Sequence, residues 1–315
     1  DIMPSLVGSE MCIRDRSLTT LSLGALSIAG SLFLFNKFKK EPVPKSVPAF
    51  FAEPAPYIFA HRGGMAERPE QTKLAFDHAA ELGLDGFETD VRLTKDHQLV
   101  VFHDDMVDRT TNGSGFVYEH TLDELKRLDA GYYFKDINGN TPYRDHEDAK
   151  ILSFEQLLIF YPNQLINVDI KDHPDTEAGK IAPKVMYETI KDHYAQNRVL
   201  VTSFHKENIA AFNRYSNGDV ALGASEQEVA EGFIKFMLGL GKSFETTENT
   251  FQMPTSFKGI KLTWPKFIQW LLESNIVPGF YGINSFDEMK DLADLGVHTL
   301  VTDYPELGAR FKNHH

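Results

Sequence analysis

Cysteine is almost absent from this sequence, since Cys12 is the only one among 315 residues. A single cysteine excludes an intrachain disulfide framework and a zinc or iron–sulfur site built from cysteines. Basic residues are also few: 32 Lys and Arg face 45 Asp and Glu, so the formal net charge is -13. Because the phosphates of a nucleic acid require a basic face, this balance argues against a nucleic-acid-binding protein.

Long uncharged runs are equally scarce, and the exception lies near the start of the chain. Residues 17–35 contain no charged side chain. A helix of that length spans roughly 28 Å, close to the ~30 Å hydrocarbon core of a bilayer. We therefore predict an N-terminal transmembrane anchor at 17–35, with a signal peptide cut after Ala29 as the alternative. Basic residues flank the run on both sides, so the membrane side of the rest of the chain stays undetermined.

The segments around this run differ in composition. Residues 1–16 resemble translated adapter or vector sequence, and we exclude them, with Cys12, from the argument. Residues 36–56 are rich in proline and lysine, which favours an extended spacer. Residues 57–315 form the predicted globular domain.

Short apolar runs alternate with segments of helical length throughout the globular part. This alternation predicts an α/β fold, a TIM (β/α)8 barrel, in which parallel strands are covered by helices. A polar, turn-rich segment at about 104–150 is predicted to be an inserted small subdomain. There are nine candidate strands for eight positions, and the link after residue 93 is too short for a crossover helix, so at least one candidate must lie outside the barrel. The candidates are residues 57–61, 86–93, 99–103, 165–171, 198–203, 219–224, 257–262, 276–283 and 298–302.

Three carboxylates lie at the ends of apolar strands. Glu88 and Asp90 are two residues apart, so their side chains leave the same face of one strand, and Asp169 ends another apolar run. Burying three carboxylates together is costly unless a cation neutralises them. An all-oxygen ligand set suits Mg²⁺ or Ca²⁺ rather than zinc. We therefore predict that these three residues bind one divalent cation.

Histidines and cations follow strands in the same way. His61 and His103 end apolar runs and could give and take protons near neutral pH. Arg62 and Lys171 could bind an anionic group, because a guanidinium matches the oxygens of a phosphate. A metal, two histidines and two cations together indicate phosphoryl transfer.

A set of ordered motifs carries a resemblance over about residues 57–310. The motifs are HRGGMAERPEQT, GFETDVRLT, VVFHDDMVDRTTNGSG, LDAG, NVDIK and VTDYP. Together they resemble the glycerophosphodiester phosphodiesterase family. The resemblance implies a TIM barrel with an inserted subdomain, and divalent-metal-dependent hydrolysis of glycerophosphodiesters to an alcohol and glycerol 3-phosphate.

The resemblance also implies roles for individual residues. His61 and His103 match the general acid and base in undetermined order, Arg62 and Lys171 the phosphate contacts, and Glu70 a supporting carboxylate. The metal ligands match Glu88, Asp90 and Asp169. The nucleophile is either water or the substrate's own glycerol hydroxyl.

Three positions depart from the family pattern. Asp169 stands where the family usually has Glu, which leaves the metal preference open. Gln71 replaces the Asn of the PENT motif, and we expect an effect on a local turn only. Tyr281 replaces a tryptophan and can still offer a ring to the glycerol or head group.

Two other functions fit the same residues. A lysophospholipase D would keep the site and act on lysophospholipids, which a membrane-held enzyme would meet. A non-catalytic barrel that binds a phosphate ligand is the second alternative, although every candidate catalytic position carries a chemically competent residue. The expected partners are a small glycerophosphodiester or lysophospholipid and a membrane, reached through the N-terminal helix.

Overall fold

The computed structural model describes residues 47–314. The predicted anchor, segment 1–16 and most of the spacer lie outside the described residues. Within residues 47–314, no helix is both long enough and apolar enough to cross a bilayer.

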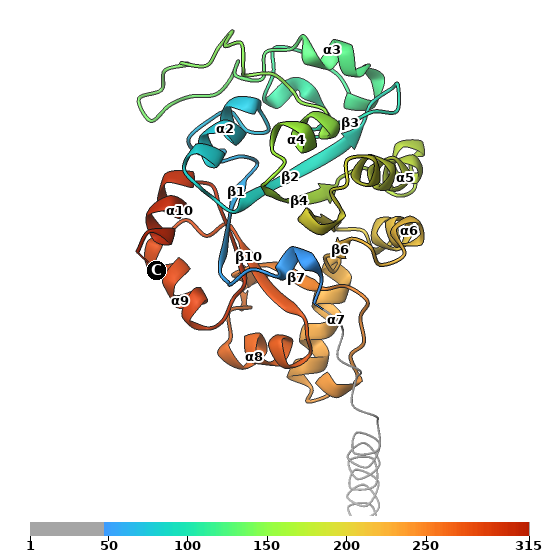
Figure 1. Cartoon of the computed structure of the whole chain (residues 1–315), viewed down its shortest axis with the longest axis vertical. Coiled ribbons are helices and arrows are strands. Elements are labelled where there is room, and N and C mark those ends of the chain that lie inside the picture. Colours follow the sequence, from blue (N-terminus) through green and yellow to red (C-terminus); the bar gives the residue numbers. More distant parts are fainter. Residues whose placement is uncertain (1–46, 315) are drawn as a thin grey trace, which may run out of the picture. The chain divides into compact units, whose positions relative to one another are not determined.

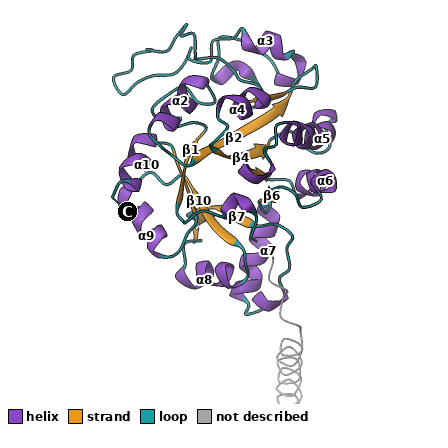
Figure 2. Cartoon of the chain, in the orientation of Figure 1, coloured by secondary structure: helices purple, strands orange, loops and turns teal. Residues whose placement is uncertain are grey.

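The predicted TIM barrel is confirmed. Eight parallel strands are hydrogen-bonded in the order β6-β5-β4-β2-β1-β11-β10-β7, and a parallel bridge between Gly223 and Thr250 closes the circle. Figure 2 shows the strands at the centre and the helices around them. The barrel strands are β1 Tyr57–His61, β2 Gly86–Leu93, β4 Leu165–Ile170, β5 Val199–Thr202, β6 Ala221–Leu222, β7 Thr250–Pro254, β10 Val277–Tyr281 and β11 Thr299–Thr302.

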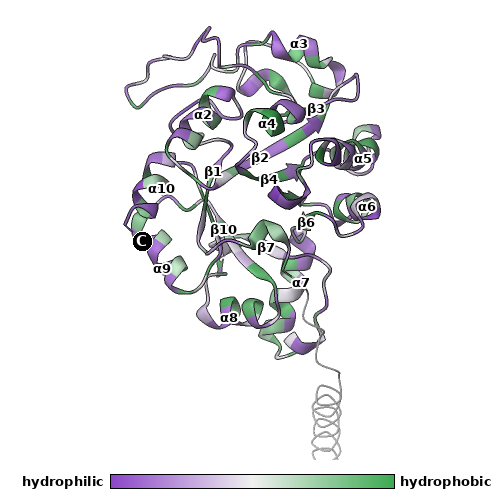
Figure 3. Cartoon of the chain, in the orientation of Figure 1, coloured by the Kyte–Doolittle hydropathy of each residue, from purple (hydrophilic) through white to green (hydrophobic). Residues whose placement is uncertain are grey.

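The helices begin where the sequence supplies side-chain caps. Ser153 and Ser225 form capping boxes with the glutamine or glutamate three residues later, and Thr72 and Thr176 cap two further helices. Most helices carry both hydrophobic and hydrophilic residues (Figure 3), so their apolar sides can cover the strands. The helices are α2 Lys73–Glu81, α3 Leu122–Lys126, α4 Phe154–Phe160, α5 Glu177–Asp192, α6 Lys206–Ser216, α7 Glu226–Met237, α8 Pro265–Glu273, α9 Phe286–Asp294 and α10 Pro305–Lys312.

Alternation along β2 separates core residues from site residues. Phe87 and Val91 point outward into the main apolar core under the helices, while Glu88 and Asp90 face the barrel interior and line its cavity. The neighbouring strand β4 repeats the pattern in register, with Glu88 opposite Asn167 and Asp90 opposite Asp169. Two adjacent strands therefore place four polar side chains side by side.

The opposite end of the barrel interior is apolar. Tyr57, Phe59, Leu200 and Val301 pack together there with Phe50 and Phe51 of the preceding 3₁₀ turn. This apolar cluster fills the amino-terminal end of the barrel, and the cavity with the polar side chains lies at the carboxyl ends of the strands. This is the end at which TIM barrels carry their active sites.

Two strand predictions need correction. Residues 99–103 do not enter the barrel, because β3 (Leu99–Val101) pairs antiparallel with the end of β2, as the short link after residue 93 required. Residues 257–262 are not a barrel strand either. They lie in an exposed hairpin of β8 (Ser256–Phe257) and β9 (Ile260–Lys261), turned by Lys258 and Gly259, both at positive φ. The sixth barrel strand is β7, which the sequence pattern did not reveal.

The long segment between β3 and α4 contains α3 and two 3₁₀ turns but no strand of the barrel (Figure 1). It has a small apolar cluster of its own, which includes Val107, Val117, Leu125 and Ala130 and joins Val100 of β3. This segment lies beside the carboxyl ends of β2 and β3, and it begins with the residues that follow His103.

Candidate active site

A cavity of about 490 Å³ opens at the carboxyl end of the barrel. It brings together all seven residues predicted to act on substrate or metal, although they come from four different stretches of chain. Tyr281 also lines it, at the end of β10, whereas Glu70 does not and lies behind Arg62. The seven are His61, Arg62, Glu88, Asp90, His103, Asp169 and Lys171.

His61 is held by a carboxylate from the far end of the sequence. Its Nδ1 lies 2.5 Å from Asp303 Oδ1, and Asp303 Oδ2 accepts a hydrogen bond of 2.6 Å from Asn284 Nδ2. Because a carboxylate accepts but does not donate, the imidazole proton sits on Nδ1. Nε2 lies on the cavity side, 3.6 Å from Glu88 Oε2. Burial opposes the charged imidazole, but Glu88 and Asp303 outweigh it and raise the pKa of His61.

His103 is oriented by a chain of ion pairs. Its Nδ1 lies 2.6 Å from Asp104 Oδ1, Asp104 pairs with Arg109, and Arg109 donates two hydrogen bonds to Glu70. Glu70 in turn accepts a bond of 3.0 Å from Arg62 Nη1. Burial lowers the pKa of His103. Although burial opposes its charge, Arg109 and His103 hold the pKa of Asp104 at about 2. Glu70 thus connects the predicted acid–base residue His103 with the predicted phosphate contact Arg62.

Arg62 reaches the cavity through an unusual backbone conformation. Its φ of 50° lies in the left-handed region, which is rare for a residue with a side chain and marks a constrained position. Gly64 makes the following turn possible, since a Cβ there would lie 2.2 Å from Pro305 Cγ. The HRGG motif therefore holds Arg62 in a constrained conformation and brings the backbone at Gly64 close to α10.

Lys171 lies between two of the predicted metal ligands. Its Nζ is 2.9 Å from Asp90 Oδ1 and 2.6 Å from Asp169 Oδ2. Burial opposes its charge, yet Asp169 and Asp90 raise the pKa of Lys171. Burial and Asp90 likewise raise the pKa of Glu88 to about 7. Three carboxylates of the cavity, of Glu88, Asp90 and Asp169, thus lie beside two cations, Arg62 and Lys171.

Gln71 also reaches this group, which corrects the expectation that it affects only a local turn. Its buried Nε2 donates a hydrogen bond of 2.6 Å to Asp90 Oδ2. Gln71 itself has a positive φ of 62°. Both oxygens of Asp90 therefore have partners within the protein.

Three buried oxygens in the cavity have no hydrogen-bond donor. They are Glu88 Oε2, Asn167 Oδ1 and Asp169 Oδ1, and all three residues line the cavity. A buried oxygen without a partner costs free energy, whereas a hard cation binds carboxylate and amide oxygens. The chemistry of these oxygens therefore suits a hard divalent cation.

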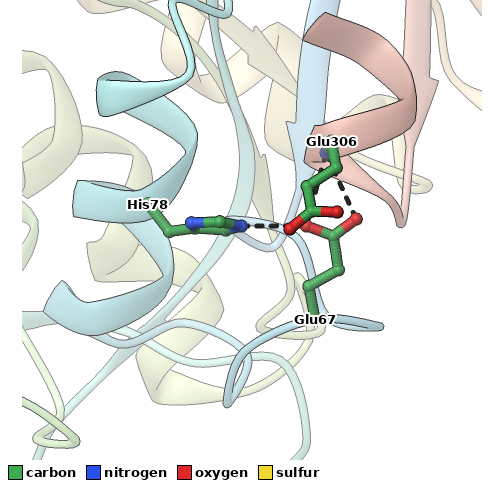
Figure 4. Close-up of side chains that lie close together, drawn as sticks. All are labelled: Glu67, His78 and Glu306. Carbon is green, nitrogen blue, oxygen red and sulfur yellow. Dashed lines mark hydrogen bonds and ion pairs between the residues drawn. The ribbon is translucent and has the colours of Figure 1, made fainter. Parts of the chain in front are cut away.

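Among the described residues, one group of carboxylate and histidine ligand atoms lies within 4.8 Å of one another, and it is outside the cavity. The set is Glu67, His78 and Glu306 (Figure 4). Glu67 accepts hydrogen bonds from the backbone N–H of Glu306, at the start of α10, and lies 2.9 Å from His78 Nε2 on α2. Through these contacts the Glu67 side chain joins α2 to the start of α10, outside the cavity.

The other side of the cavity is apolar. Val229, Phe233 and Ile234 of α7 face it, together with Phe257 and Ile260 of the β8–β9 hairpin. Phe204 lies beside the cations, with Lys171 Nζ 4.9 Å from the centre of its ring. A charged half and an apolar half therefore meet in one cavity.

Sequence reasoning missed several residues that hold the site. Asn167 lies two residues before Asp169, so strand alternation could have placed it on the same face. Asp104 stands in the HD motif and Asp303 in VTDYP, but neither motif shows which imidazole its aspartate contacts. No sequence pattern indicated a contact between Asn284 and Asp303.

Comparison with known proteins identifies the family of this chain. Residues 61–307 match the Glycerophosphoryl diester phosphodiesterase family. A glycerophosphodiester phosphodiesterase of Bacillus altitudinis is 31% identical over 258 residues, which cover 81% of this chain and 97% of that protein.

Two solved structures share the fold. A glycerophosphoryl diester phosphodiesterase domain from Mycobacterium tuberculosis has a TM-score of 0.72 at 19% identity and covers 83% of this chain and 100% of that one. An Oleispira antarctica phosphodiesterase, solved with the product sn-glycerol-3-phosphate, has a TM-score of 0.65 at 23% identity over 82% of this chain and 97% of that one.

Proposed function

The chain belongs to the glycerophosphoryl diester phosphodiesterase family, and we propose that it hydrolyses glycerophosphodiesters to an alcohol and glycerol 3-phosphate with the help of one divalent cation. The observation that carries this proposal is the convergence of two carboxylate-held histidines, two cations and three carboxylates on one cavity. The named activity of the Bacillus altitudinis relative and the product seen in the Oleispira antarctica enzyme support it.

Glu88, Asp90 and Asp169 would hold the cation, and Asn167 would add a neutral oxygen. The oxygens of Glu88, Asn167 and Asp169 that accept no hydrogen bond support this assignment. When bound, the cation would draw negative charge from the phosphoryl oxygens.

Arg62 and Lys171 would bind the phosphate of the substrate. Arg62 Nε has no hydrogen-bond partner although it is buried, and its guanidinium is held from behind by Glu70. Lys171 carries its charge at the cavity wall because Asp90 and Asp169 stabilise it. Two fixed cations orient a phosphodiester without a rearrangement of the site.

His61 and His103 would exchange the protons of the reaction at Nε2. In both imidazoles Nδ1 is hydrogen-bonded to a carboxylate, of Asp303 or Asp104, which fixes the tautomer and the ring orientation. One imidazole accepts the proton of the nucleophile and the other donates a proton to the leaving alkoxide.

Phosphorus NMR on glycerophosphocholine tests the activity. Wild-type protein should release glycerol 3-phosphate, and His61→Ala and His103→Ala should each reduce the rate by at least ~100-fold. His193→Ala is the matched control, because His193 lies at the end of α5 and pairs with Glu155 on the surface. Full activity in both site variants would contradict the proposal, and binding without turnover by the wild type would favour a phosphate-binding barrel.

The apolar half of the cavity favours a second candidate, a lysophospholipase D. Val229, Phe233, Ile234, Phe257 and Ile260 offer a wall for an acyl chain next to the phosphate-binding cations. Ile260→Asn should then lower kcat/KM for lysophosphatidylcholine and leave kcat/KM for glycerophosphocholine unchanged. Equal effects on the two substrates would remove this candidate.

We further propose that residues 17–35 anchor the enzyme in a membrane, on the basis of their length and lack of charge. Leu26→Arg in the full chain should move the protein from the alkali-resistant membrane fraction into the wash. Retention of this variant in the membrane after alkali would contradict the anchor.

A further inference from the structure

A band of exposed apolar side chains borders the mouth of the cavity. It consists of residues from α7 and from the β8–β9 hairpin, and we call it the apolar rim. Its members are Ile234, Met237, Leu238, Phe257 and Ile260, which are 56%, 51%, 67%, 37% and 51% exposed. Contiguous exposed apolar residues on a folded domain indicate an interaction surface.

The rim is continuous. Ile234, Phe257 and Ile260 line the same cavity, while Met237 and Leu238 follow Ile234 by three and four residues and so lie on the same side of the helix. Within α7, Gly232 is the only fully buried residue. The hairpin follows directly on the carboxyl end of β7, the end of the barrel that carries the cavity.

On the hairpin side of the rim the charge is opposite to that of the chain as a whole. Residues 249–272 contain three lysines and no acidic residue, although the net charge of the chain is -13. Lys258 and Lys261 lie on the hairpin itself, and Lys258 Nζ is 5.0 Å from the centre of the Phe257 ring. Apolar side chains beside lysines complement a surface that is apolar inside and negative outside.

Trp264 adds a third feature. It directly precedes α8, three residues after Lys261, and is 49% exposed. Tryptophan is favoured at the boundary between the head groups and the hydrocarbon of a bilayer.

We propose that the apolar rim docks the barrel on an anionic phospholipid surface, with the cavity mouth facing the lipid. Exposed apolar residues, an excess of lysine and a flanking tryptophan support lipid as the occupant. The inference does not depend on the reaction in the cavity, and it does not depend on the anchor proposed for residues 17–35.

The test uses the full chain with vesicles of brominated phosphatidylcholine, with and without phosphatidylserine. Brominated lipid should quench tryptophan fluorescence when phosphatidylserine is present, and Trp264→Phe should remove that quenching. The double variant Met237→Ser/Leu238→Ser and the single variant Lys261→Glu should each weaken it by about fivefold or more. All variants retain residues 17–35, so a difference between them cannot come from the predicted anchor.

Two exposed positions away from the rim supply matched controls. Ile137→Ser removes an apolar side chain from a fully exposed site in the segment after β3, and Lys184→Glu reverses a charge on α5. Brominated lipid should quench the tryptophan fluorescence of both controls as strongly as that of the wild type. Every variant should hydrolyse soluble glycerophosphocholine at the wild-type rate.

Three results would overturn docking on lipid. The first is that lipid does not quench Trp264 in the wild type. The second is that Trp264 of the Met237→Ser/Leu238→Ser variant is quenched as strongly as in the wild type. The third is that the wild type forms a dimer that this variant does not form, while lipid still quenches Trp264 of the variant. None of them bears on the proposed hydrolysis, which is measured separately on the soluble substrate.

Discussion

His61 Nδ1 lies 2.5 Å from Asp303 Oδ1, although the two residues are separated by 242 positions. The contact exists because β1 and β11 are neighbours in the barrel, with Ala60 opposite Thr302. Asn284 then fixes Asp303 through its side-chain amide and through the backbone N–H of Asp303. One end of the chain thereby sets the tautomer of a histidine near the other end of the domain.

Asp303→Asn should therefore reduce kcat for glycerophosphocholine by roughly 10- to 100-fold, with little change in KM. An amide can turn its NH₂ toward Nδ1 and favour the wrong tautomer. The pH profile should also change, because Asp303 contributes to the raised pKa of His61. Asp291→Asn, at an exposed position of α9, is the control. An unchanged kcat and pH profile in Asp303→Asn would remove the positioning role.

Asn167→Ala should raise the cation concentration needed for half-maximal activity by roughly 10-fold. The reason is that Asn167 Oδ1 is a buried oxygen without a donor beside Glu88. Gln252→Ala is a matched control, since Gln252 is an amide in the same cavity whose NH₂ already bonds Thr250 and Thr299. Equal cation requirements for Asn167→Ala and the wild type would exclude Asn167 as a ligand.

The ion pair of Asp104 predicts a pH-dependent stability. Its pKa falls from 3.8 to about 2 in the folded protein, because Arg109 and His103 stabilise the carboxylate against the cost of burial. A lowered pKa stabilises the fold above the unfolded value and loses that effect as the pH falls through the folded value. Asp104→Asn should therefore lower the free energy of unfolding near neutral pH by about 1 kcal/mol, after allowance for solvent screening.

Urea denaturation of wild type and Asp104→Asn at a series of pH values measures this effect. The difference between the two proteins should shrink as the pH falls from 3.8 to about 2. A difference that stays constant over that range would show that the ion pair does not contribute through its charge.

Gly64→Ala should destabilise the protein more than Gly83→Ala. Both glycines have positive φ, but a Cβ at Gly64 would lie 2.2 Å from Pro305 Cγ, whereas one at Gly83 has nothing within 4 Å. We expect a loss of about 1 kcal/mol for Gly83→Ala from backbone strain alone, and more than about 2 kcal/mol for Gly64→Ala. Equal losses by chemical denaturation would contradict the close approach of this turn to α10.

Much of the fold could be predicted from the sequence because the barrel strands are short and buried on both faces. The predicted ranges 57–61 and 86–93 coincide with β1 and β2. β7 escaped prediction because Gln252 and Pro254 interrupt its apolar pattern, although Phe251 and Met253 pack outward into the core. The hairpin was mistaken for a strand because Phe257, Ile260 and Leu262 imitate a buried run around Lys258 and Gly259.

The candidate site could be predicted where its residues stand at strand ends, and not where contacts join distant segments. Glu88, Asp90 and Asp169 follow from strand alternation. Asp303 beside His61 depends on which strands are neighbours in the closed barrel, and the contact between Gln71 and Asp90 depends on the loop after β1. Pairings of this kind are set by tertiary structure, which no local pattern records.

Metal-dependent hydrolysis at the Glu88, Asp90 and Asp169 site is tested most directly by adding back cations to chelated enzyme. The measurement is phosphorus NMR of glycerophosphocholine hydrolysis by wild type and Glu88→Gln, before and after addition of Mg²⁺ or Ca²⁺. We predict that chelation abolishes release of glycerol 3-phosphate, that one of the two ions restores it in the wild type, and that Glu88→Gln stays inactive. Full activity of thoroughly chelated wild type, or restoration of Glu88→Gln to the wild-type rate, would contradict the account.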